Sequence, residues 1–200
     1  MLTSITPLGE RGRRRAWGPT VTALGVGSVV GGMGAGASAG LLGSALALVW
    51  RPGPGATAVL LAGLAALAGM FDSRSLGWKL PTVRRQVDEE WLTRYRGWVV
   101  GLGYGVQLGA AVTTIVTSAS VYLLLAVALL TAAPVAGAVV GATFGLARAL
   151  PVYGARRVTS PQRLATASRR LDAWAPHAAR TTAVVLWVVA AATLLPAVAG

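Results

Sequence analysis

Apolar residues gather in five long segments of the chain, and charged residues are almost absent from them. The segments cover residues 20–49, 56–71, 98–130, 134–150 and 181–199. A charged side chain at the centre of a bilayer costs roughly 2.5–3.5 kcal/mol, so a chain that clears charge from whole segments is typical of helices in lipid. A helix needs about 20 apolar residues to cross the hydrocarbon core. The pattern predicts an all-α, polytopic transmembrane helical bundle of about five spans.

Two kinds of connection separate these segments. Residues 51–55 and 131–133 form short turns that predict tight helical hairpins, whereas the other connections are long and rich in arginine. All basic side chains except Arg51 then lie on one side of the membrane. The positive-inside rule places the basic side in the cytoplasm, so we expect the N-terminus inside and the C-terminus outside. The apolar run after Arg13, Arg14 and Arg15 is too long for a signal peptide, and we interpret it as a retained first span.

The predicted organisation is a basic cytoplasmic segment, residues 1–19, followed by one transmembrane domain, residues 20–200. Two of the basic loops contain an amphipathic stretch that begins at a proline, near 81–96 and 161–175. Apolar residues recur on one face of each stretch, which predicts helices lying on the cytoplasmic interface. Each long span also precedes a tight turn, a short span and a basic loop. That order is typical of an internal repeat, and equally of any helical hairpin with a basic loop.

Two of the spans are too long for a bilayer. At about 1.5 Å per residue, residues 98–130 would reach roughly 50 Å against a hydrocarbon core near 30 Å. The span must tilt strongly, protrude or break. The first span has the same excess length and carries glycines in its middle, at Gly31, Gly32, Gly34 and Gly36. Whether these two spans are continuous, broken or re-entrant stays open.

Small residues recur every four positions in three of the spans. These ladders are Gly101, Gly105 and Gly109; Gly137, Gly141 and Gly145; and Gly32, Gly36 and Gly40 with Ser44. A face of small residues lets helix backbones approach closely, which favours packing where lipid supplies no hydrophobic drive. The functional alternative is unwound backbone lining a substrate site. We interpret the ladders as helix-packing faces.

Polar side chains in the third span form the candidate site. Gln107, Thr114 and Ser118 fall near one stripe of a helix. An amide is costly to leave unpaired in hydrocarbon, so Gln107 needs a partner or water. The three residues would be substrate or pore contacts in a transporter. In a packed bundle they would be hydrogen bonds between or within helices.

Composition excludes several kinds of chemistry. The chain has no cysteine, which removes disulfides and thiol redox relays, and no span carries an acidic residue or histidine away from its ends. We expect no catalytic residues, no metal and no cofactor, and proton coupling is disfavoured. The net charge is +12, but the basic residues lie beside apolar spans, so we expect anionic lipid headgroups rather than nucleic acid as their partners.

One stretch of the chain is similar to a known family. The run Arg84-Arg85-Gln86-Val87-Asp88-Glu89-Glu90-Trp91, then Gly101-x-Gly103-x-Gly105-x-Gln107-x-Gly109 and a Thr/Ser run, resembles small bacterial membrane proteins of the cytochrome c biogenesis (thiol-disulfide electron carrier) type. The resemblance implies a shared fold. Those carriers rely on a membrane cysteine pair that this chain lacks at Thr113 to Ser120, so their redox activity does not carry over. The five-span count is a further departure.

These observations favour a multi-pass protein of the plasma (inner) membrane that is not an enzyme. The first hypothesis is a structural or regulatory membrane subunit that packs through its glycine ladders against itself, as a homo-oligomer, or within a larger membrane complex. The alternative is a small transporter or facilitator for a neutral or anionic solute.

Overall fold

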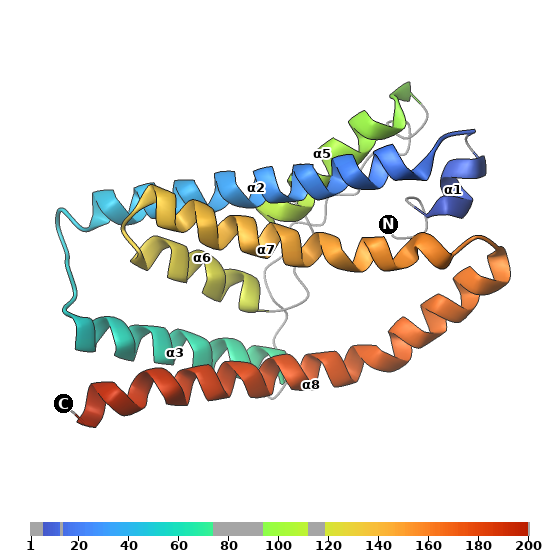
Figure 1. The fold of residues 1–200 in the computed structure, drawn as a ribbon. Coiled ribbons are helices and arrows are strands. Elements are labelled where there is room, and N and C mark those ends of the chain that lie inside the picture. Colours follow the sequence, from blue (N-terminus) through green and yellow to red (C-terminus); the bar gives the residue numbers. More distant parts are fainter. Residues whose placement is uncertain (1–5, 13, 74–93, 112–118, 200) are drawn as a thin grey trace.

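The computed structural model describes residues 6–12, 14–73, 94–111 and 119–199, and nearly all of these are helical (Figure 1). The elements are α1 (Pro7–Gly12), α2 (Trp17–Leu46), α3 (Pro54–Asp72), α5 (Gly97–Ala110), α6 (Ser120–Leu130), α7 (Pro134–Gly154), the 3-10 turn η1 (Ala155–Arg157) and α8 (Pro161–Ala199). The predicted all-α helical bundle is confirmed.

Helices long and apolar enough to cross a membrane number four among the described residues. They cover Trp17–Leu46, Pro54–Asp72, Pro134–Arg157 and Pro161–Leu195. Proline opens three of these helices, at a position where its missing N–H is not needed. The chain is therefore built as a polytopic bundle.

The third predicted span, residues 98–130, consists of two helices rather than one. Helix α5 ends at Ala110, and the next residue, Ala111, caps it with a left-handed φ of 58°. The Ala111 N–H donates to the Gln107 carbonyl at 3.2 Å. Helix α6 then starts at Ser120. The two helices have 14 and 11 residues, and a span needs about 20, so neither crosses a bilayer by itself. Of the three options left open by its excess length, this segment breaks.

The first predicted span, residues 20–49, is one continuous helix. Helix α2 runs through 30 residues, including the glycines in its middle. Gly31, Gly32 and Gly36 are buried against α5 and α7, so the neighbouring backbones support the helix where glycine would otherwise weaken it. The same excess length thus gives a break in one segment and an unbroken helix in the other.

Helix α8 joins two elements that the sequence separates. The amphipathic stretch 161–175 and the last span, 181–199, form one helix of 39 residues that bends along its first half (Figure 1). Pro176 lies inside it, where proline removes an intrahelical hydrogen bond. The other amphipathic stretch, near 81–96, falls almost entirely outside the described residues.

The helices form two layers. In the first, which we call the glycine layer, α2 packs against both α5 and α7. In the second, the alanine layer, α3 packs against α8, and α6 contacts helices of both layers. Figure 1 shows α1 and the α7–α8 connection at one end of the bundle and the α2–α3 turn at the other. We call the first of these, which carries Arg14, Arg15, Arg156 and Arg157, the basic end.

Candidate functional site

The contact between α2 and α7 brings backbone against backbone. The helices run antiparallel, with Gly32 facing Gly141 and Gly36 facing Gly137. A Cβ built on any of these four glycines would overlap the carbonyl oxygen of the glycine opposite. Gly145 meets the Ser28 carbonyl in the same way. No side chain larger than hydrogen fits at these positions without moving a helix.

The contact between α2 and α5 repeats this pattern on another face of α2. Gly101, Gly105 and Gly109 face, on successive turns, the carbonyl oxygens of Thr20, Leu24 and Ser28. All three glycines are buried. Because van der Waals contact between backbones is a main force that joins helices in lipid, α2 is the central helix of this layer.

Ser28 lies where α2, α5 and α7 meet. Its side chain is fully buried, and its Oγ donates to the Gly145 carbonyl at 2.7 Å. Sequence reasoning missed this residue, although Ser28 stands four positions before Gly32 and so extends that ladder toward the N-terminus. The four-residue spacing of small residues is the signal that could have found Ser28, because serine is small enough to continue a glycine ladder.

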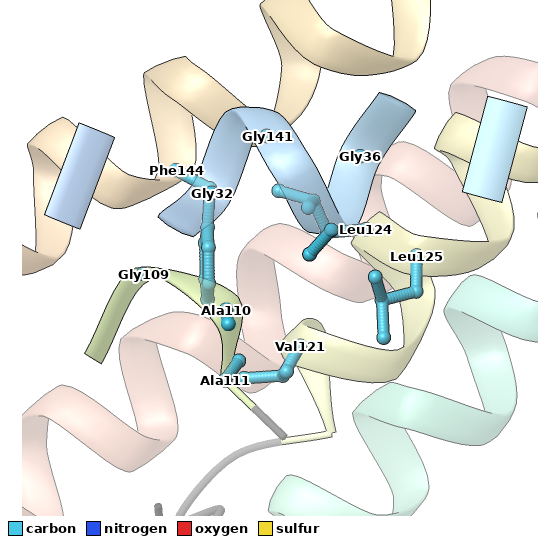
Figure 2. A pocket seen from close by; sticks show the side chains of 11 residues that line it. Gly32, Gly36, Gly109, Ala110, Ala111, Val121, Leu124, Leu125, Gly141 and Phe144 are labelled. Carbon is cyan, nitrogen blue, oxygen red and sulfur yellow. The ribbon is translucent and has the colours of Figure 1, made fainter. Parts of the chain in front are cut away.

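Between α2, α5, α6 and α7 the packing leaves a cavity of about 10 Å³ (Figure 2). Its lining is entirely Gly, Ala, Val, Leu and Phe: Gly32, Ala35, Gly36, Gly109, Ala110, Ala111, Val121, Leu124, Leu125, Gly141 and Phe144. A water needs about 10–15 Å³ and two to four polar partners. This cavity gives a water scarcely enough room and no polar side chain, so we expect it to be dry.

The predicted polar stripe is only partly described by the structure. Gln107 lies on α5, half-buried, and does not line the cavity beside Gly109. Thr114 and Ser118 fall outside the described residues. Their role as substrate or pore contacts therefore stays a prediction, and the described part of the stripe consists of Gln107 alone.

A carboxylate that sequence reasoning passed over is buried at the basic end. Glu10 of α1 is 2% exposed, and the Thr20 hydroxyl donates to its Oε2 at 3.1 Å. A Cβ on Gly97, the first residue of α5, would lie 3.1 Å from the same oxygen. The carboxylate thus sits beside the first turns of α2 and α5, where the helix dipoles favour negative charge. Because α1 has only six residues, no periodicity marked it in the sequence.

A second carboxylate connects the two layers. Asp72, the last residue of α3, accepts the Ala119 backbone N–H at 2.7 Å on its Oδ1. Ala119 directly precedes α6, so this carboxylate lies at the N-terminus of the second half of the broken segment. Among the residues that the structure describes, no three His, Cys, Asp or Glu side chains are grouped to hold a metal ion.

Comparisons with known proteins find two related sequences. The chain is 35% identical to "Methylamine utilization protein MauF" of Methylophilus methylotrophus over 156 residues, which is 76% of this chain and 53% of that protein. It is 34% identical to the protein of the same name from Paracoccus denitrificans over 137 residues, 68% of this chain and 48% of the other. The chain thus spans about half the length of these relatives.

No protein-family model and no solved structure matches the chain. The relatives found are methylamine utilization proteins, and the comparisons show no similarity to the cytochrome c biogenesis type. That resemblance is therefore unconfirmed. The structure shows an all-α bundle with helices long and apolar enough to cross a membrane, and the comparisons add that the relatives found are methylamine utilization proteins.

Proposed function

We propose that this chain is an accessory protein of methylamine utilization, held in the plasma membrane by its spans, and that it acts by packing against other membrane proteins or further copies of itself. It is not an enzyme in this proposal. The similarity to the two MauF proteins supports the process. The long apolar helices support the location.

The observation that carries the proposal is the glycine layer. Three ladders fix α2 between α5 and α7 by contacts to backbone carbonyls, and the cavity that these helices line together with α6 is about 10 Å³ and apolar. A transporter needs a wet path, and an enzyme needs reactive groups at a cleft. The lining of this cavity supplies neither, whereas a rigid scaffold that positions outer helix faces needs only the packing.

A chimera tests the proposed process. The segment of the Paracoccus denitrificans protein that matches this chain is replaced by the corresponding residues of this chain, and the chimera is expressed in a strain that lacks the native gene. We expect growth on methylamine to be restored. Gln107→Leu should preserve that growth, and Gly141→Leu should abolish it. A chimera that reaches the membrane at native levels without restoring growth would refute the proposal.

One observation favours transport as a second candidate. The third segment breaks at Ala111, and helices broken inside a membrane form the binding sites of many transporters. Single-cysteine labelling separates the two functions, because the native chain has no cysteine. Probes at Gln107, Thr114 and Ser118 labelled by a membrane-impermeant reagent would indicate an aqueous path and favour transport. Protection at all three, with Pro52 labelled as control, would favour packing.

A further inference from the structure

A wide hollow opens at the basic end, where α7 gives way to η1 and α8. Its volume is about 520 Å³. The residues that line it are Gly154, Arg157, Val158, Gln162, Arg163, Thr166, Ala167 and Arg170. A second hollow, of about 360 Å³, lies at the opposite end of the bundle and has one charged residue in its lining, Arg51. The two ends therefore differ sharply in charge.

The larger hollow is arranged to hold an anion with several oxygens. Three arginines line it, and Arg163 and Arg170 stand seven residues apart on one face of α8 with Thr166 between them. Arg163 is already positioned, because its Nη1 donates to the Arg157 carbonyl and to Thr159 Oγ1, each at 3.3 Å. The Gln162 amide adds neutral donors, and no acidic side chain is in the lining. Arginine groups of this kind suit phosphate oxygens.

An exposed apolar stripe leads along α7 to this hollow. Val135, Val139, Leu146 and Leu150 lie on one side of the helix, at separations of four or seven residues, and the next position in that row is Gly154. Their side chains are exposed, from 51% at Leu146 to 77% at Val135. A ligand that extends from the hollow along α7 would therefore have an anionic head and an apolar tail.

Exposed aromatic and apolar side chains on α8 indicate at which level of a bilayer the hollow lies. Trp174 is 70% exposed, Leu171 is exposed as well, and the Trp174 ring lies 6.0 Å from that of His177. Exposed tryptophan beside arginine is typical of the headgroup layer of a bilayer. We propose that the hollow binds the phosphate headgroup of an anionic phospholipid, whose acyl chains lie along the α7 stripe. This proposal does not depend on the proposed function.

The test compares two lipids and two double variants. The full chain, purified in a non-ionic detergent, is titrated with phosphatidylglycerol or with phosphatidylcholine of the same acyl chains, and bound lipid is counted by native mass spectrometry. We expect one phosphatidylglycerol to bind saturably. R163Q/R170Q should weaken that binding roughly tenfold or more, because each arginine near an anionic surface contributes about 1 kcal/mol. R156Q/R180Q removes the same charge from positions outside the lining and should change it little.

A third variant tests the hollow without changing charge. A Cβ on Gly154 meets nothing within 4 Å, so Gly154→Leu should fold normally while it fills part of the hollow. It should also weaken phosphatidylglycerol binding. Equal losses in the two double variants would mean diffuse attraction and would overturn the proposal. Competition by inorganic phosphate at the same concentration as the lipid would mean a site for a free anion and would overturn it as well.

Discussion

The two layers use small residues in different ways. In the glycine layer, the ladder glycines of α5 and α7 face backbone carbonyls of α2. In the alanine layer, α3 buries Ala62, Ala65 and Ala68 instead, and a Cβ on Gly69 would first meet the Trp187 side chain, 3.1 Å away at Nε1. A backbone cannot yield to an added atom, but a half-exposed indole can. Close backbone approach therefore defines the first layer, and side-chain packing defines the second.

One buried hydroxyl also distinguishes the glycine layer. Ser28 gives the glycine layer a buried hydrogen bond between helices, to the Gly145 carbonyl. The threonine hydroxyls on α8 bond within their own helix, as Thr193 does to the Val189 carbonyl at 2.9 Å. The helices of the glycine layer are thus joined by backbone contacts and by a hydrogen bond. We expect it to open last on unfolding.

The largest expected effect comes from a bulky residue in the glycine layer. Gly141→Leu places a side chain against the Gly32 carbonyl and should destabilise the bundle by about 3 kcal/mol or more, or prevent its folding. Gly63→Leu on α3 is the control, because nothing lies within 4 Å of a Cβ there. Thermal unfolding in detergent measures both variants. Similar losses at the two positions would mean that the layers do not differ as described.

A smaller change compares the two layers directly. Gly105→Ala meets the Leu24 carbonyl and the Ser28 backbone N, so we expect a loss of about 1–3 kcal/mol. Gly69→Ala meets the Trp187 side chain, which can shift, and alanine also gains helix propensity, so its effect should be below about 1 kcal/mol. Denaturant titration of the two variants gives the comparison. A larger loss of stability at Gly69 would mean that the alanine layer, and not the glycine layer, is the one that tolerates an added atom least.

The smallest expected effect concerns the buried hydroxyl. Ser28→Ala removes the hydrogen bond to Gly145 without adding bulk, and interhelical hydrogen bonds in membrane proteins are worth about 1 kcal/mol or less. Ser38→Ala is the matched control on the same helix, because the exposed Ser38 bonds only to the Gly34 carbonyl of its own helix, at 2.8 Å. Equal unfolding temperatures for the two variants would show that the bond contributes nothing to the glycine layer.

The candidate site was less predictable than the fold. The four-residue spacing of small residues pointed to helix contacts, and the structure places Gly101, Gly105 and Gly109, together with the ladder on α7, against α2. Gln107 drew attention because an amide is costly in lipid, yet the described cavity is apolar and Gln107 does not line it. Glu10 was missed because α1 is too short to show periodicity, and Asp72 because its partner, Ala119, lies far away in the sequence.

Periodicity and charge clearance by themselves determined that this chain is an all-α membrane bundle, because the cost of charge in lipid acts on each segment separately. Only the tertiary structure decided which long segment breaks. Residues 20–49 and 98–130 are both longer than a bilayer needs and both carry glycines, but α2 is supported on two faces and stays continuous, whereas the other segment ends its first helix just before Ala111. Local sequence cannot encode that difference, because it depends on which helices lie alongside.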